Sequence, residues 1–225
     1  MKTYHPPMLL TILVCLLSSC NTSRVSNHTS TSQSGTTQDN RWRPLFNHEN
    51  LDGWNALPGG KWEIQQGIIA GTSPATERLH GILISDKIYS DFKLKVIYKS
   101  IKGNSGVYFR VEKVNHPAQV FGLQAEIDPD KDAGGLYETG GRDWVVQPTP
   151  ENVKKWYKPN EWNKMIIIAK GKDVTVYLNG YKTAEIKNDP GRTEGYIGLQ
   201  LHGRMEMNVL FKDILIIENP KTMEF

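Results

Sequence analysis

The segment Phe121–Asp128 constrains the fold of this chain most, because apolar and polar residues alternate along it. Successive side chains of a β-strand leave opposite faces of the pleat, so this pattern predicts a strand with one face in a core. The other face would carry three polar side chains: Gln124, Glu126 and Asp128. Alternate positions on a strand are roughly 7 Å apart, a spacing at which two carboxylates suit acid–base chemistry on a sugar.

Two further segments, Val107–Val111 and Gly198–His202, divide between an apolar and a polar face in the same way. In the first segment the valines and Phe109 are predicted to face the core, and in the second the leucines do. The residues predicted to share the polar faces are Tyr108, Arg110, Gly198, Gln200 and His202. A solvated face usually contains more lysine, serine and threonine, so we interpret the three polar faces as one concave surface that carries a site.

Short strands of this kind recur from Arg41 onward. Asn163–Lys170 and Asp173–Leu178 predict a hairpin, and Asn179-Gly180 predicts a tight turn after it. Asp91–Ile101 alternates with its lysines on the outward side. No segment keeps a convincing helical period, and many short strands at regular spacing predict an all-β fold, a two-sheet antiparallel β-sandwich.

The stretch from Pro129 to Asn160 departs from this pattern, because it is long and rich in glycine, proline, tryptophan and charge. It directly follows the strand with the two carboxylates, and we predict a long ordered loop, a kind of segment that often carries function. Three of its side chains are predicted to fold over the polar face: Tyr137, Arg142 and Trp144.

The first 40 residues are predicted to be a targeting segment and a tether. The apolar run Met8–Leu17 leads into Ser18-Ser19-Cys20, which is typical of a bacterial lipoprotein signal. Residues 1–19 are then the signal peptide, residues 20–40 are a lipidated Cys20 with a flexible Ser/Thr-rich tether, and residues 41–225 are the domain. The alternative is a plain secretory peptide cut nearby. We expect a lipid-anchored protein of the bacterial cell envelope, on its periplasmic or outer-surface face.

Charge and cysteine content exclude other classes of function. The formal net charge of +3 over 225 residues is small and the basic residues form no stripe, which argues against nucleic acid as a partner. Only Cys20 remains after the predicted signal peptide, so the sequence offers neither a disulfide nor a cysteine metal site. It also has no Gly-rich dinucleotide-binding loop.

Several motifs occur in the order and at the spacing of one protein family. They are Leu51-Asp52-Gly53-Trp54, Gly103–Arg110, Gly122–Asp128, Gly135–Glu138, Leu178-Asn179-Gly180 and Gly198–His202. In these motifs the chain resembles the 3-keto-disaccharide hydrolase domain family, and the resemblance covers nearly everything after the tether. It implies a concanavalin-like jelly roll of two antiparallel sheets. It also implies action on glycosides whose sugar has been oxidised to a 3-ketone.

Cleavage of a 3-keto-glycoside would need a base for the hydrogen at C2, a group near the enolate oxygen and an acid for the departing oxygen. Glu126 and His202 are the candidates for base and acid, with Arg110 near the developing oxyanion. Asp128 could orient one of them or bind a cation. The candidate sugar contacts are Asn104, Tyr108, Gln124, Tyr137, Arg142 and Gln200.

Two other functions stay open for the same residues. Glu126-Ile127-Asp128 resembles the start of the Glu-x-Asp-x-x-Glu signature of laminarinase-type glycosidases, which hydrolyse glycosides with two carboxylates. Lys131 stands at the third acidic position of that signature. The other alternative is a non-catalytic carbohydrate-binding surface module, which the tether and the sandwich would suit equally well.

Purely structural roles are further alternatives. Glu126 and Asp128 could form salt bridges with Arg110, His202 could be a structural histidine, and Arg142 could anchor its loop.

A metal site is the remaining candidate. Asp128, Asp130 and Asp132 stand at alternate positions, like the start of a calcium loop. Ala133 and Thr139 depart from that motif at its sixth and twelfth positions, which leaves a looser divalent-cation site as the cofactor candidate.

Overall fold

The computed structural model describes Met1 and residues 41–224. The predicted signal peptide after Met1, Cys20 and the tether lie outside the described residues. Within the described residues, no helix is long and apolar enough to cross a membrane.

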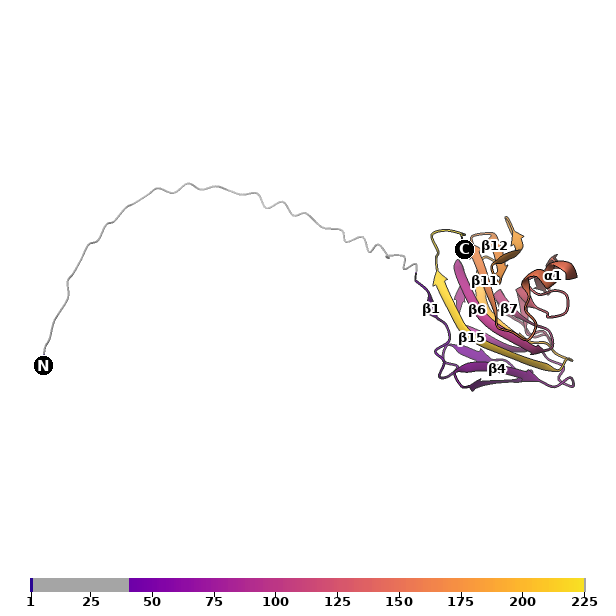
Figure 1. Ribbon diagram of the computed structural model, residues 1–225, viewed down its shortest axis with the longest axis horizontal. Coiled ribbons are helices and arrows are strands. Elements are labelled where there is room, and N and C mark those ends of the chain that lie inside the picture. Colours follow the sequence, from indigo (N-terminus) through magenta and orange to yellow (C-terminus); the bar gives the residue numbers. More distant parts are fainter. Residues whose placement is uncertain (2–40, 225) are drawn as a thin grey trace. The chain divides into compact units, whose positions relative to one another are not determined.

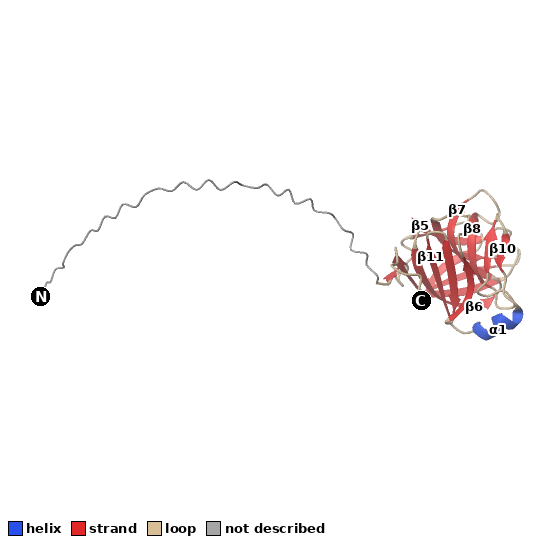
Figure 2. Ribbon diagram, turned by 90° about the horizontal axis from the view of Figure 1, so that it is seen from above, coloured by secondary structure: helices blue, strands red, loops and turns tan. Residues whose placement is uncertain are grey.

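Two antiparallel sheets make up the domain (Figures 1 and 2). In order across the first sheet, the strands are β13 (Tyr181–Ile186), β12 (Asp173–Leu178), β11 (Asn163–Lys170), β6 (Phe92–Lys102), β15 (Met207–Glu218), β4 (Ile68–Ser73) and β3 (Lys61–Gln65), with β1 (Arg43–Pro44) also paired to β15. In the second sheet they are β10 (Asp143–Val146), β9 (Leu136–Thr139), β8 (Val120–Ile127), β7 (Ser105–Lys113), β14 (Gly195–Leu201), β5 (Gly81–Tyr89) and β2 (Trp54–Ala56). The predicted all-β sandwich is confirmed, and β11 and β12 form the predicted hairpin with the predicted bounds.

Alternation along the strands builds the core between the sheets. On β6, Phe92, Leu94, Val96 and Tyr98 are fully buried, and the lysines between them face outward. On β8, the apolar residues Leu123, Ala125 and Ile127 join the same cluster. The opposite face of β8 therefore lies on the outside of the sandwich and carries Gln124 and Glu126.

The stretch 129–160 is not the loop that the sequence predicts. It contains the short strands β9 and β10 and the seven-residue helix α1 (Pro150–Trp156). Thr149 caps the helix, since its hydroxyl accepts a hydrogen bond from the Asn152 backbone N–H, and Pro150 occupies the first turn. Elements of four and seven residues are too short to show a period in the sequence, which explains the error.

The prediction that Arg110 shares the polar face of β7 with Tyr108 is wrong. Tyr108 pairs with Gly198 and Val111 pairs with Tyr196, so β7 has one residue more than its neighbour between these pairs, a β-bulge. Arg110 lies in the bulge with φ 52°, and its guanidinium donates to the Ser90 carbonyl over 2.9 and 3.2 Å.

The same bulge moves the residue after Arg110 to the opposite face. Val111 packs against Ile82, Ile84, Tyr108 and Val120, rather than with Val107 and Phe109 in the core between the sheets. A single extra residue in a strand reverses the facing of every residue that follows it.

A glycine on the neighbouring strand makes room for the bulge. Gly122 of β8 has φ 141°, and a Cβ at this position would lie 2.9 Å from the Arg110 carbonyl oxygen. Both the backbone conformation and the close approach therefore require glycine.

We predict that Gly122→Ala lowers the free energy of unfolding by about 2–4 kcal/mol, because it adds a clash at the bulge to an unfavourable φ. Urea unfolding would measure the change. Gly171→Ala is the matched control, since Gly171 also has a positive φ of 53° but nothing within 4 Å of the added Cβ. Equal losses for the two variants would contradict the close approach at the bulge.

Candidate functional site

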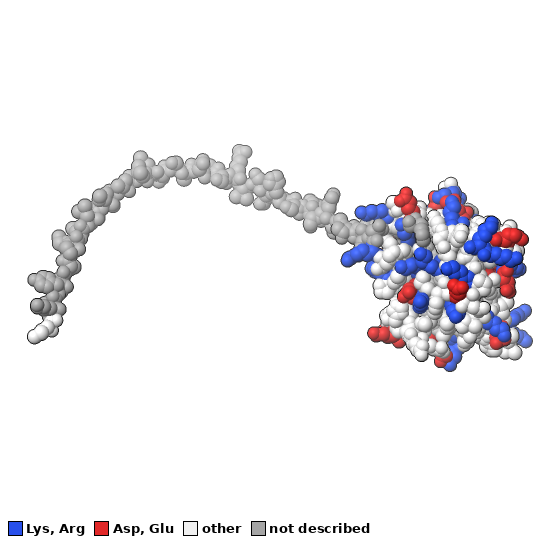
Figure 3. Space-filling model, viewed as in Figure 1, with Lys and Arg blue, Asp and Glu red and all other residues white. Residues whose placement is uncertain are grey.

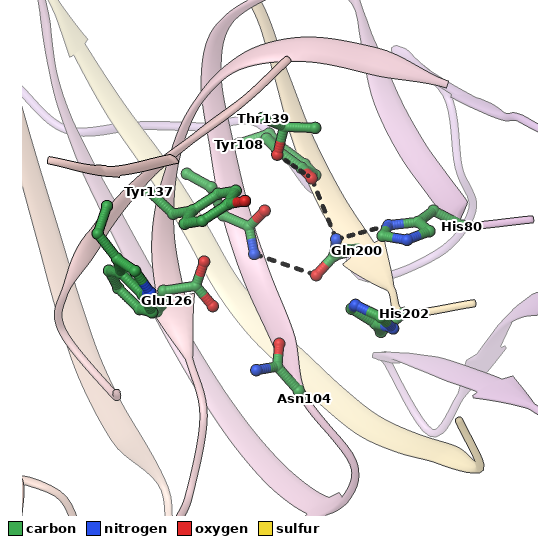
Figure 4. A pocket seen from close by; sticks show the side chains of 10 residues that line it. His80, Asn104, Tyr108, Glu126, Tyr137, Thr139, Gln200 and His202 are labelled. Atoms are coloured by element: carbon green, nitrogen blue, oxygen red, sulfur yellow. Dashed lines mark hydrogen bonds between the residues drawn. The ribbon is translucent and has the colours of Figure 1, made fainter. Parts of the chain in front are cut away.

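A polar cavity of about 250 Å³ opens on the outer face of the second sheet (Figure 4). Its lining comes from β7, β8, β9, β10 and β14, from the residues just before β5 and β7, and from the residue just after β14. The residues that line it are His80, Asn104, Tyr108, Gln124, Glu126, Tyr137, Thr139, Trp144, Gln200 and His202. Side chains distant in the sequence thus converge on one sheet face.

A hydrogen-bond network centred on Gln200 holds the floor of the cavity together (Figure 4). The Gln200 amide nitrogen donates to the Tyr108 hydroxyl over 3.1 Å and lies 2.8 Å from Nδ1 of His80. Its carbonyl oxygen accepts from the Gln124 amide over 3.1 Å, and Tyr108 and Thr139 share a hydrogen bond of 2.9 Å. Gln200 is 2 % exposed, so these bonds replace the water that its amide loses.

Two glycines give these side chains their space. Gly106 lies opposite Glu126 in the β7–β8 register, and a Cβ there would overlap the Gln124 side chain. Gly198 lies opposite Tyr108 in the β7–β14 register, and a Cβ there would lie 3.1 Å from the Ile82 side chain. The missing side chain at Gly106 allows Gln124 to lie across the sheet and reach Gln200.

Glu126 is the buried carboxyl of the cavity and is 5 % exposed. Burial raises its pKa well above the usual range, and the negative charges of Asp128 and Asp132 raise it further. A hydrogen bond with Gln124 opposes these effects. The environment therefore favours the neutral carboxyl, which can donate a proton.

His80 and His202 form a pair of imidazoles whose ring centroids are 4.4 Å apart. Burial and, to a smaller extent, the neighbouring His202 and His116 lower the pKa of His80 to about 4. Because the Gln200 amide donates to Nδ1 of His80, the proton of the neutral ring belongs on Nε2. In His202, Nδ1 lies 2.7 Å from the Gly203 carbonyl, which only accepts, so Nδ1 carries the proton and Nε2 has a free lone pair.

Two aromatic side chains form the rim of the cavity. Tyr137 of β9 and Trp144 of β10 pack edge to face, with ring centroids 5.4 Å apart. The Tyr137 hydroxyl donates to Asp143 over 2.6 Å, and this bond contributes most to raising the pKa of Tyr137 to about 12. The rim therefore offers an aromatic surface with a neutral phenol.

Most of the residues predicted from the sequence come together in this cavity. They are Asn104, Tyr108, Gln124, Glu126, Tyr137, Gln200 and His202. Three predicted residues lie outside it: Arg110, Asp128 and Arg142.

Asp128 lies in the cleft next to the cavity. Its carboxylate accepts hydrogen bonds from the Asn104 side chain over 3.1 Å and from the Asp130 backbone N–H over 2.8 Å. Asp132 accepts from the Gln147 side chain over 3.2 Å. Over residues 41–224, no group of three or more His, Cys, Asp or Glu is arranged to hold a metal ion. The carboxylates of Asp128 and Asp132 thus bond to the chain around them.

Arg142 anchors the turn between β9 and β10 rather than lining the cavity. Its guanidinium pairs with Glu138 and lies 2.8 Å from the Asp189 carboxylate, which is 1 % exposed. The prediction that Arg142 contacts the sugar does not fit this position, and loop anchoring, the alternative expected from the sequence, does.

Two cavity residues were not identified as site residues from the sequence, namely His80 and Thr139. In the antiparallel register, Gln200 pairs with Ile82 and Leu201 with Gly81, so His80 and His202 come next to each other. Thr139 ends β9, whose register places Tyr137 opposite Gln124. Both positions follow from strand pairing across long stretches of chain, which local alternation does not reveal.

The sandwich and its polar cavity define a jelly-roll domain with a carbohydrate-related function. A family model described as the 3-keto-alpha-glucoside-1,2-lyase-like domain matches residues 41–217, and the chain belongs to this family. The family resemblance seen in the sequence motifs is confirmed. A search of curated proteins finds no match.

Solved structures with the same fold include two proteins from Parabacteroides distasonis, each described as a "putative glycosyl hydrolase". One is 23% identical, with a TM-score of 0.58, and the match covers 79% of this chain and 93% of that one. The other is 25% identical, with a TM-score of 0.55 and coverage of 79% and 98%. The carbohydrate-binding module CBM66 from Bacillus subtilis is 17% identical, with a TM-score of 0.56 and coverage of 74% and 96%.

We predict that nitrogen NMR of the imidazoles finds His80 neutral at pH 5.5, about one pH unit below the usual pKa of histidine, with its proton on Nε2. The expected titration is at a pH of about 4, since burial lowers the pKa of this ring. Gln200→Leu would remove the donor to Nδ1 and allow both tautomers. An unchanged tautomer in the variant would show that Gln200 does not control this ring. A normal pKa in the wild type would contradict the effect of burial on it.

We predict that Arg142→Ala lowers the free energy of unfolding by about 3 kcal/mol, because it leaves the buried Asp189 carboxylate without its cation. Chemical denaturation would measure the loss. Arg142→Ala combined with Asp189→Asn should be more stable than Arg142→Ala alone. If the folded Arg142→Ala protein is as stable as the wild type but loses sugar binding, the anchoring role is wrong.

Proposed function

We propose that this protein cleaves glycosides whose sugar ring carries a ketone at C3, by elimination across C1 and C2 followed by hydration. One observation carries the proposal: a carboxyl that burial favours as neutral shares a cavity with two imidazoles in opposite tautomers. Such a cavity offers a proton donor and a proton acceptor together. The family description, which names a 1,2-lyase acting on a 3-keto-glucoside, supports the same chemistry.

In the proposed reaction, the ketone makes the hydrogen at C2 acidic. A base removes it as a proton, and the electron pair of the C–H bond moves into an enolate. The enolate then expels the substituent at C1, whose oxygen takes up a proton as the C1–O bond breaks. Addition of water to the resulting double bond places hydroxyl at C1 and hydrogen at C2, so the net change is hydrolysis.

The residues divide these roles by their protonation. His202 is the base, because Nε2 has a free lone pair when its Nδ1–H bonds the Gly203 carbonyl. Glu126 is the acid for the departing oxygen, because its environment favours the protonated form. The Nε2–H group of His80 stabilises the enolate oxygen. The sequence had predicted Arg110 for this role.

Conventional hydrolysis by two carboxylates fits the cavity less well. That mechanism needs a second carboxyl facing the same glycosidic bond, about 5–9 Å from the first. Glu126 is the only Asp or Glu among the described residues that line the cavity, and Asp128 faces the neighbouring cleft. The small volume also suits one sugar ring, with the rest of the substrate outside.

A non-catalytic carbohydrate-binding module is the second candidate. The edge-to-face pair of Tyr137 and Trp144 at the rim favours it, because aromatic faces pack against sugar rings without chemistry. The likeness to the carbohydrate-binding module CBM66 is consistent with this function, although at 17% identity it concerns the fold alone.

We predict that Glu126→Gln and His202→Asn each lower kcat/KM for a 3-keto-glucoside by about 10²–10⁴-fold, since each removes one proton-transfer group. Asp130→Asn, in the neighbouring cleft, is the control and should keep wild-type turnover. As an acid, Glu126 acts only when protonated, so wild-type kcat/KM should fall as pH rises through its raised pKa. Near-normal turnover of both variants would contradict the mechanism.

A further inference from the structure

The outer face of the first sheet is made of lysine and isoleucine along its two central strands, β6 and β11. The outward positions are Lys93, Lys95, Ile97, Lys99 and Ile101 on β6, and Lys164, Ile166, Ile168 and Lys170 on β11. Neither strand contains an acidic residue. We call these nine residues the lysine–isoleucine face.

The register interleaves the two residue types. Across the pair of strands, Lys164 lies opposite Ile97, Ile166 opposite Lys95, and Ile168 opposite Lys93. Each apolar side chain therefore lies beside a lysine whose stem can cover it while the ammonium group stays in water. Ile166 and Ile168 are buried in this way, with exposed fractions of 6 % and 0 %.

Three lysines of this face have uncharged partners. Lys93 and Lys170 donate to backbone carbonyls, of Glu224 and Lys221, which carry no charge. The ammonium of Lys95 lies 4.8 Å from the centroid of the Trp42 ring. Figure 3 shows basic side chains, with acidic ones among them, across the side of the domain on which β6 and β15 are labelled in Figure 1.

The two acidic residues of the adjacent strand β15 contact other side chains. Asp213 lies 3.7 Å from the His48 imidazole, and Glu218 pairs with Arg43. The Glu218 carboxylate therefore compensates Arg43 rather than the lysine–isoleucine face.

The chain joins the domain at this face. Trp42, 36 % exposed, helps to line a groove of about 310 Å³ together with Lys93, Lys95, Lys164, Ile166, Ile168 and Ile217. The strand that follows it, β1, pairs with the second half of β15. The described residues 41–224 thus begin beside the lysine–isoleucine face, and the predicted lipid anchor at Cys20 precedes them in the sequence.

We propose that the lysine–isoleucine face lies against a bilayer of anionic lipids. Lysines near such a surface are attracted to its negative potential, and tryptophan is enriched where lipid meets water. The cavity lies on the outer face of the other sheet, so this placement would turn its opening away from the bilayer. The proposal does not depend on what the cavity binds.

Vesicle co-sedimentation at low salt tests this without the lipid anchor. The protein is the chain from residue 21 to 225, which keeps every strand of the described residues. It should bind vesicles of equimolar phosphatidylglycerol and phosphatidylcholine, but not vesicles of phosphatidylcholine alone. Lys95→Glu combined with Lys99→Glu should weaken binding by about 20-fold or more, since each lysine near an anionic surface contributes roughly fivefold.

The matched control is Lys154→Glu combined with Lys158→Glu, which changes the net charge equally at exposed positions in and after α1. This control should bind like the wild type, and thermal unfolding confirms that both variants fold. Equal weakening of the two variants, or equal binding to neutral vesicles, would overturn the proposal. If residues 41–225 bind the vesicles but residues 21–225 do not, the segment before the domain covers the face in place of the bilayer.

Discussion

The arrangement of the site depends on the hydrogen bonds of one buried amide, that of Gln200. Its nitrogen donates to Tyr108 and to His80, and its oxygen accepts from Gln124, so it joins β7, β8, β14 and the start of β5. An amide in an almost dry position must keep these partners, because an unpaired buried group costs about 1–3 kcal/mol. The same bonds that satisfy Gln200 therefore determine which nitrogen of His80 carries its proton.

Burial determines the protonation of the carboxyl in the cavity, as hydrogen bonding determines the tautomers of the two imidazoles. Glu126 lies on a central strand of a rigid sheet, and burial together with Asp128 and Asp132 favours its neutral form. Perturbed groups of this kind concentrate at functional sites. Asp128 lines the neighbouring cleft rather than the cavity, but its charge raises the pKa of Glu126 inside the cavity.

Alternation of apolar and polar residues in the sequence predicted much of the fold and most of the cavity. It could do so because the two-residue period of a strand depends only on that strand. It assigned Gln124, Glu126 and Gln200 to a shared face, where they lie. It failed at Arg110, since a bulge adds a residue within the strand and its clearest signal, a glycine, lies on the neighbouring strand. It also missed His80, whose place depends on pairing between distant segments.

The most direct test of the account is to compare aglycone release from a 3-keto-glucoside and from its unoxidised parent by the chain from residue 21 to 225. The proposed elimination requires the ketone, because only the ketone makes the hydrogen at C2 acidic enough for the proposed base, His202, to remove. The account predicts release from the keto compound alone. Release from the parent at a comparable rate would contradict it in favour of conventional hydrolysis, and sugar binding without release from either would assign the cavity to recognition.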